Sequence, residues 1–220
     1  MMKRTLLLLS LAVSQPAWLF AQLFTKVTTG PVVTTAGDSR SVNFVDVNND
    51  GWEDLFISNG PQDGDHNFLY LNNGDGSFSS LTNDDIVTTN GAYDGATFGD
   101  YDNDGDPDAL VVTWWGEKNH FFRNEGNGTF TEDVTITPAI PNTYSETAAW
   151  GDYDLDGWLD LYVTNSDGDF KNLLYHNNGD GTFTKIISGA QSTDAKTSRG
   201  ATWIDFDLDV CGKSFFWGIN

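Results

Sequence analysis

Short apolar segments alternate with polar, glycine-rich ones along most of the chain. One set, rich in β-branched, aromatic and small residues, reads VNFV, ATFG, AAWG and ATWI, and its members end at residues 45, 99, 151 and 204. A second set, LFIS, ALVV and LYVT, begins at residues 55, 109 and 161. Continuous apolar runs of this length predict strands that are covered on both faces.

Each unit also contains the signals for two further strands. The segments FLYL (68–71), HFFR (120–123) and LLYH (173–176) lead into glycine-rich turns, after which SFSSL, TFTED and TFTKI follow. These turns are hairpin signals, and four strands in about 50 residues match one blade of a β-propeller. The sequence therefore predicts an all-β fold, a β-propeller with four-stranded antiparallel blades. It is incomplete, with about three blades plus flanking strands, and a sandwich of repeated hairpins is the alternative.

The first strand of each unit shows a graded pattern of side-chain size. One position is mostly small and the position two residues later is large and aromatic, as in the pairs Val42/Phe44, Ala96/Phe98, Ala148/Trp150 and Ala201/Trp203. This grading suits a sheet that narrows toward a central axis. At the N-terminal end, LFTKV (23–27) matches TFTKI (182–186), which predicts an outer strand there. The mature chain would begin with an outer strand and end in the innermost strand of a fourth unit.

An acidic segment recurs in register with these strands. It reads DVNNDGWED from residue 46, DYDNDGDPD from residue 100 and DYDLDGWLD from residue 152. The turn segments NNGDGSF, NEGNGTF and NNGDGTF recur with the same period, beginning at residues 72, 124 and 177. Two motifs repeated in register about every 50 residues indicate a radial or stacked array of supersecondary units.

The acidic segments predict three Ca²⁺ sites. Ca²⁺ takes six to eight oxygen ligands in a flexible shell, and a glycine at the sixth position permits the sharp turn around the ion. The first, third, fifth and ninth side chains and the seventh backbone carbonyl would be ligands. The residues concerned are Asp46, Asn48, Asp50, Trp52 and Asp54; Asp100, Asp102, Asp104, Asp106 and Asp108; and Asp152, Asp154, Asp156, Trp158 and Asp160.

Other interpretations of these loops fit less well. A single loop of this composition could be a plain turn with Asx capping. An EF-hand would need Glu at the twelfth position, where this chain has Ile57, Val111 and Val163. Mg²⁺ prefers a tighter octahedral shell, and zinc is disfavoured because His66, His120 and His176 occupy non-equivalent repeat positions and Cys211 stands alone. The first loop has three ionised ligands against four in the others, which predicts weaker calcium binding there.

A fourth loop departs from the pattern. Asp205, Asp207 and Asp209 are in place, but Val210 replaces the glycine and Lys213 replaces the last aspartate. An ammonium group at that position would oppose a bound cation. No tight calcium site is predicted there.

The N-terminus predicts export. Lys3 and Arg4 precede a leucine-rich run, and Ala21 offers a small residue for cleavage, so residues 1–21 form a secretory signal peptide pattern. The formal net charge of −21 excludes a nucleic-acid binder that works through phosphate contacts, while 8 Trp and 15 Phe are enough to build a core. The predicted domains are the signal peptide and a propeller over 22–220, with units at about 39–89, 90–141 and 142–194 and a partial unit at 195–220. The mature chain contains no predicted transmembrane segment.

The phrases FGDYDNDGDPD (98–108) and WGDYDLDGWLD (150–160), with the NGDGTF turns, resemble the FG-GAP/VCBS repeat family. This family includes the calcium-binding propeller of integrin α-subunits, and the resemblance covers about residues 23–209. It implies a seven-bladed propeller, adhesion or surface recognition, and in some members an attached enzyme. Because three complete units cannot close such a ring, further blades or self-association would be required.

Three functions compete. The favoured one is a secreted, extracellular or cell-surface (alternatively periplasmic) calcium-binding module for adhesion to a protein or glycan. Its recognition surface would come from the segments 60–67, 114–119 and 166–171, with Trp114 and Trp115 as an aromatic platform. An exported enzyme of the polysaccharide lyase or phosphodiesterase type is the second, although no catalytic motif is present. Its candidate residues are departures from the repeat, namely Arg40 and Arg199, where the other copies have Asp94 and Glu146, together with His66, Tyr93 and His120. A structural spacer is the third.

Overall fold

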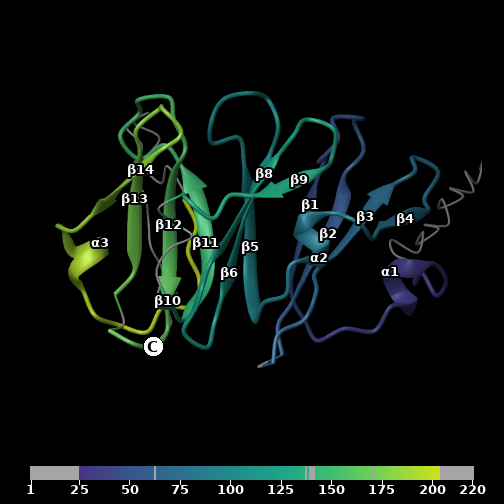
Figure 1. The fold of residues 1–220 in the computed structure, drawn as a ribbon, viewed down its shortest axis with the longest axis horizontal. Coiled ribbons are helices and arrows are strands. Elements are labelled where there is room, and N and C mark those ends of the chain that lie inside the picture. The colour runs from purple at the N-terminus through teal and green to yellow at the C-terminus, as the bar shows by residue number, and fades with distance from the viewer. Residues whose placement is uncertain (1–24, 62, 137, 139–141, 170, 204–220) are drawn as a thin grey trace, which may run out of the picture.

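The computed structural model describes residues 25–203 except 62, 137, 139–141 and 170, and in that part of the chain the fold is all-β. The strands form three four-stranded antiparallel sheets, each with its strands in chain order, standing side by side (Figure 1). The first sheet contains β1 (Ser39–Val45), β2 (Asp54–Asn59), β3 (Phe68–Asn72) and β4 (Phe78–Leu81). The second contains β5 (Tyr93–Gly99), β6 (Asp108–Thr113), β8 (His120–Asn124) and β9 (Phe130–Glu132). The third contains β11 (Ser145–Gly151), β12 (Asp160–Asn165), β13 (Leu173–Asn177) and β14 (Phe183–Ile186).

Small elements complete the described chain. The strands β7 (Glu117–Lys118) and β10 (Asn142–Thr143) form a two-stranded sheet between the second and third units. Three single-turn helices are also present: α1 (Pro31–Thr34) precedes the first sheet, α2 (Asp85–Thr88) connects the first and second sheets, and α3 (Ala190–Thr193) follows the third. No helix in the described part of the chain has the length and apolar character that a membrane span requires.

Two apolar layers hold the three sheets together. Between the first and second sheets, Phe56 and Leu69 belong to one buried cluster with Val111 and Phe122. Between the second and third sheets, a buried cluster is built from both sides by the side chains Leu110, Phe121, Val163 and Tyr175, among others. Because both faces of the middle sheet are covered, β6 is buried along its whole length, as its continuous apolar sequence predicts.

The inner strands β1, β5 and β11 share one irregularity. In each, the pairing with the second strand shifts by one residue near the start, at positions 39–41, 93–96 and 145–147. Such a β-bulge leaves one residue outside the ladder and redirects its side chain. The bulged segments carry Arg40, Asp94 and Glu146, so the same irregularity places a charged side chain at the same end of each inner strand.

The small and large side chains of the graded pattern are covered in the second and third sheets but exposed in the first. Ala96 and Ala148 are buried, and Phe98 and Trp150 pack against Phe56 and Phe121 of the preceding sheet. The equivalent side chains of the first sheet, Val42 and Phe44, are 59% and 66% exposed. Within the described residues, no sheet stands before the first one to cover them.

Two predicted flanking strands are wrong in the part that the structure describes. Residues 25–27 of the expected N-terminal outer strand and residues 201–203 of the expected fourth inner strand form no strand. A strand needs a neighbouring chain for its backbone hydrogen bonds, and neither segment has a paired ladder among the described residues. The Trp203 indole Nε1 instead donates to the carbonyl oxygen of Ala149 at 3.0 Å. The predicted signal peptide and the fourth acidic loop lie outside the described residues.

Candidate functional site

Each acidic loop follows an inner strand and folds back on its first aspartate. Asp46 accepts hydrogen bonds from the backbone amides of Asp50 and Gly51 at 3.1 and 2.8 Å. Asp100 and Asp152 accept the equivalent pairs of amides at 2.9–3.1 Å. The fourth loop residue has a positive φ in all three loops, and the glycine at the sixth position has a φ between 88° and 98°. The predicted turn around a common centre is therefore formed three times, with glycine where the left-handed backbone favours it.

The ninth loop residue is a fully buried aspartate in every copy. Asp54, Asp108 and Asp160 each have 0% relative exposure. Asp54 accepts the amides of Val47 and Asn72 at 3.1 and 2.7 Å, and Asp160 accepts those of Tyr153 and Asn177, both at 2.9 Å. Each carboxylate thus joins its own loop to the end of the third strand of its sheet.

Burial makes the ionised form of these aspartates costly. Desolvation raises the pKa of Asp108 to about 8 and that of Asp160 to about 6, and it also raises the pKa of Asp54, against the opposing effect of the backbone amides. Neighbouring loop carboxylates raise the pKa values further. A buried carboxylate of this kind is stable as an anion when a cation balances it.

The second loop shows the best fit to a cation. Its carboxylate oxygens from Asp100, Asp102 and Asp108 lie within 4.8 Å of one another. The Tyr101 amide approaches Asp108, but Asp108 Oδ2 makes no hydrogen bond of normal geometry, and Asp102 Oδ1 is likewise buried without a partner. Two unpartnered, inward-facing oxygens are what a hard cation such as Ca²⁺ would coordinate.

The other two loops gather their predicted ligands in different ways. In the third loop, oxygens of Asp152, Asp154 and Asp156 lie within 4.8 Å of one another. In the first loop, Asp46 and Asn48 both accept the amide of Asp50 at 3.1 Å, so their side-chain oxygens converge. The assignment of the backbone carbonyl oxygens of Trp52, Asp106 and Trp158 as ligands stays a prediction.

The structure adds His176 to the third loop, a residue to which the sequence analysis assigned no role. Its Nδ1 lies 3.4 Å from Asp154 Oδ2 and 3.2 Å from Asp160 Oδ1. The sequence signal that could have identified His176 is its position directly before Asn177, where the first two units have Leu71 and Arg123. The other histidines differ, because His120 pairs with Glu132 at 2.7 Å and His66 approaches the carbonyl oxygen of Thr89.

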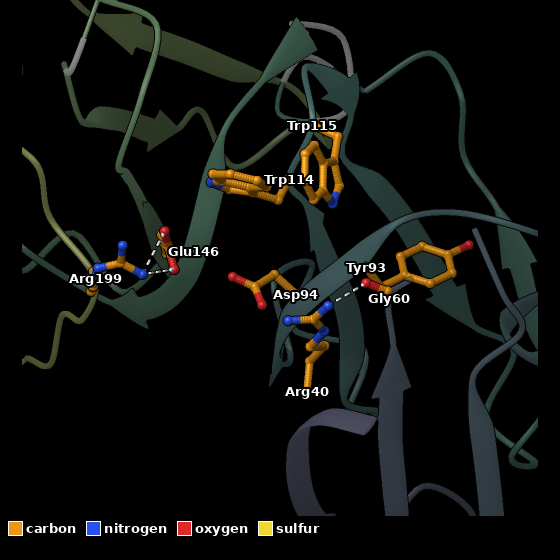
Figure 2. A pocket seen from close by; sticks show the side chains of 8 residues that line it. All are labelled: Arg40, Gly60, Tyr93, Asp94, Trp114, Trp115, Glu146 and Arg199. Atoms are coloured by element: carbon orange, nitrogen blue, oxygen red, sulfur yellow. Dashed lines mark hydrogen bonds and ion pairs between the residues drawn. The ribbon is translucent and has the colours of Figure 1, made fainter. Parts of the chain in front are cut away.

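A pocket lies at the opposite ends of the inner strands from the acidic loops. We call it the inner-strand pocket, and Figure 2 shows its lining. It has a volume of about 200 Å³ and is lined by Arg40, Gly60, Tyr93, Asp94, Trp114, Trp115, Glu146 and Arg199. The structure thus brings together three residues that depart from the repeat, Arg40, Arg199 and Tyr93. Asp94 and Glu146, which the other copies have at the position of the two arginines, line the same pocket.

Two carboxylates and two guanidinium groups line this pocket. Arg40 Nη2 donates to the carbonyl oxygen of Gly60 at 2.9 Å, and Arg199 Nη1 lies 3.2 Å from Glu146 Oε1. The carboxylates of Asp94 and Glu146 lie between the two guanidinium groups (Figure 2). Burial first, and then hydrogen bonding and repulsion from Glu146, raise the pKa of Asp94 to about 6, while both arginines oppose this shift.

The two tryptophans have different surroundings. Trp114 is half-buried, donates from Nε1 to Ser166 Oγ at 2.9 Å and packs edge-to-face on Tyr144. Trp115 is 41% exposed, and its ring centre lies 4.3 Å from that of Trp114. Trp114 is therefore held by its neighbours, and Trp115 presents its ring to the solvent. The exposure of Trp115 is compatible with the predicted aromatic platform.

Comparison with known proteins identifies one family of repeats. Residues 46–111, 110–163 and 152–210 match the FG-GAP-like repeat. No curated protein matches the chain. Among solved structures, the chain is similar to a lectin from Agrocybe aegerita, whose description concerns recognition of non-reducing terminal N-acetylglucosamine. The two are 18% identical with a TM-score of 0.48, and the alignment covers 73% of this chain and 42% of the lectin.

Proposed function

This chain belongs to the FG-GAP-like repeat family, and we propose that it is a secreted, calcium-binding β-propeller module that recognises an extracellular glycan or protein. The three four-stranded sheets would be three blades, since each has its strands in chain order and packs face to face with its neighbour. Further blades, or association with another chain, would complete the ring.

The observation that carries the calcium assignment is the buried carboxylate at the ninth loop position. Asp108 has 0% exposure and an oxygen without a hydrogen-bond partner, next to the side chains of Asp100 and Asp102. Calcium would neutralise this cluster and tie together the loop and the strand end that Asp108 already connects. The same position is filled by a buried aspartate in the other two loops, which supports three sites of one kind.

A binding role fits the second feature of the molecule. Charged and aromatic groups converge in the inner-strand pocket, on strand ends that the sheets hold in place. Polar groups placed on a rigid scaffold around a concave, partly aromatic surface are the usual composition of a ligand site. The calcium loops at the other ends of the same strands would stabilise this scaffold.

The test is thermal unfolding of the chain in excess Ca²⁺ and in chelator, together with calorimetric titration. Each site saturated at 100 times its dissociation constant adds about 2.7 kcal/mol to the free energy of unfolding when the unfolded chain does not bind. We expect a large calcium-dependent rise in Tm and a stoichiometry of three ions. An unfolding transition that is the same in calcium and in chelator would refute the metal assignment.

A matched pair of variants separates ligands from ordinary acidic residues. The triple variant Asp54→Asn, Asp108→Asn and Asp160→Asn removes one carboxylate from each loop and should abolish the calcium response. The double variant Asp75→Asn and Asp180→Asn removes exposed carboxylates of the hairpin turns, which bond only within their own turns, and should retain the response. N-terminal sequencing of the exported product tests secretion, with cleavage expected after Ala21.

A further inference from the structure

The inner-strand pocket is made by one irregularity repeated in three sheets. Arg40, Asp94 and Glu146 each lie in the bulged segment of an inner strand, where the ladder skips one residue. β-Bulges are frequent next to functional sites because they redirect a side chain without interrupting the sheet. The repeat therefore delivers a side chain to this place in every unit, and the identity of that side chain differs from unit to unit.

The backbone around the pocket is closely fitted. A Cβ atom added to Gly60 would lie 1.6 Å from the carbonyl oxygen of Tyr93, so only glycine allows the two strand ends to approach each other. Trp115 has a φ of 65°, an uncommon conformation for a bulky residue. The Gly116 amide donates to the carbonyl oxygen of Thr143 at 3.0 Å, which holds the loop that carries Trp115. Strain of this kind persists where the surroundings hold it, and it is common at ligand sites.

The charges of the lining exclude strongly charged ligands. Arg40 and Arg199 contribute two positive charges, and Asp94 and Glu146 contribute two negative ones when ionised. An anion would face the two carboxylates and a cation would face the two guanidinium groups. The lining therefore offers neither kind of ion a net opposite charge. The nearby Asp38, 3.6 Å from Arg40, and the net charge of −21 disfavour polyanions further.

The remaining chemistry favours a neutral ligand with many hydroxyl groups. Carboxylates accept hydrogen bonds and guanidinium groups donate them, and bonds to charged groups are the stronger ones. The exposed ring of Trp115 offers an apolar face, and it lies beside Trp114 in the lining of the pocket (Figure 2). At about 200 Å³ the pocket is smaller than the roughly 300–1,000 Å³ of sites for drug-sized ligands, which suits a single ring.

We propose that the inner-strand pocket binds one uncharged sugar residue, with its ring against Trp115 and its hydroxyl groups bonded to Arg40, Asp94, Glu146 and Arg199. This inference rests on the recognition role proposed above and names its ligand class and residues. It does not depend on the calcium sites being occupied in a particular number.

The test is a glycan array of neutral, anionic and amino-bearing glycans, probed with the calcium-saturated chain. Calorimetric titration then follows with the methyl glycoside of the terminal sugar that binds. We expect binding to a neutral terminal sugar, weakened about tenfold or more by Trp115→Ala. Arg199→Gln should weaken it about threefold to tenfold, and because Arg199 is mostly exposed this variant should fold normally.

Controls of the same residue types come from elsewhere on the surface. Phe44→Ala removes an exposed aromatic ring from β1, and Arg123→Gln removes an exposed arginine that pairs with Glu125. Both should bind the methyl glycoside as the unaltered chain does. Calcium-dependent unfolding, measured on every variant, shows that each has folded.

Four outcomes would overturn the proposal. These are binding only to anionic or amino-bearing glycans, binding only to peptides in a parallel peptide array, sugar binding that Trp115→Ala and Arg199→Gln leave unchanged, or no glycan binding by a calcium-stabilised chain. In the last case the calcium response stands and only the sugar assignment fails. An absent calcium response with sugar binding intact would refute the metal sites alone.

Discussion

The side-chain amide of Asn177 donates a hydrogen bond to the backbone carbonyl oxygen of Tyr101 at 2.7 Å, across the boundary between the third and second sheets. The equivalent Asn124 donates to the carbonyl oxygen of Val47 in the first acidic loop at 2.8 Å. The hairpin turns of the second and third sheets are therefore each tied to the acidic loop of the preceding sheet. If the loops bind calcium as proposed, this contact would couple metal binding in one loop to the packing of the next sheet.

Removal of the Asn177 side chain should destabilise the fold. Asn177→Ala leaves the buried carbonyl of Tyr101 without its partner, and a lost buried hydrogen bond of this kind costs about 1–3 kcal/mol. The measurement is the urea midpoint in saturating Ca²⁺. The control Asn178→Ala removes an exposed side chain that bonds to Thr182 and Thr184 within its own hairpin, and it should cost less than about 1 kcal/mol. Equal losses in the two variants would contradict this coupling.

Asp108→Asn should have opposite effects with and without calcium. Because burial raises the pKa of Asp108 to about 8, the ionised carboxylate costs stability in the metal-free protein as pH rises from about 4 to 8. At pH 7.5 in chelator, the variant should therefore unfold at a higher temperature than the unaltered chain. In excess Ca²⁺ the order should reverse, because the variant lacks a ligand whose site adds about 2.7 kcal/mol. The same order in both conditions would show that Asp108 is not a ligand.

The non-equivalent positions of the histidines argue against zinc as the common metal of the loops, but His176 lies beside the third loop and should give that loop alone an added preference for zinc. Imidazole is a better ligand for zinc than for calcium, and His176 Nδ1 lies within 3.4 Å of two loop carboxylates. We expect zinc to bind the third loop, and His176→Leu, which copies the first unit, to weaken zinc binding about tenfold. Calcium affinity should stay within about twofold. The matched change Leu71→Ala in the first unit should leave zinc binding unaltered, and zinc affinity independent of His176 would refute this role.

Asp94→Asn should change the pH dependence of stability. The pKa of Asp94 in the folded chain, about 6, lies above its ordinary value of 3.8, so its ionisation costs stability between about pH 4 and 6 and the cost is constant above that. The variant should match the unaltered chain near pH 4. Near pH 7 it should be more stable by about 1–2 kcal/mol, a value reduced for the partial exposure of the group.

Urea unfolding at a series of pH values, in the same calcium concentration for both proteins, measures this difference. The matched variant Asp167→Asn changes an exposed aspartate and controls for the loss of one carboxylate from the surface. A pH-independent effect of Asp94→Asn would contradict the raised pKa that burial and the neighbouring Glu146 give Asp94.

The sequence by itself determined the strands, the hairpin turns and the acidic loops of each unit. These features depend on interactions within a few residues, such as the amides of Asp50 and Gly51 that bond to Asp46, and the left-handed backbone that Gly51 adopts. Repetition allowed these features to be predicted, because three copies in register are not expected by chance. The membership of the chain in the FG-GAP-like repeat family follows from the same local residues.

Tertiary structure alone decided what surrounds each functional side chain. The burial of Asp108, the approach of His176 to Asp154 and Asp160, and the exposure of Phe44 depend on which sheets and strands lie alongside. The inner-strand pocket depends on a β-bulge in each of the three inner strands and on Arg199. No local sequence pattern predicts these bulges. The physical reason is range: turns and alternation are set by neighbours in the chain, whereas register, burial and charge pairing are set by packing between distant segments.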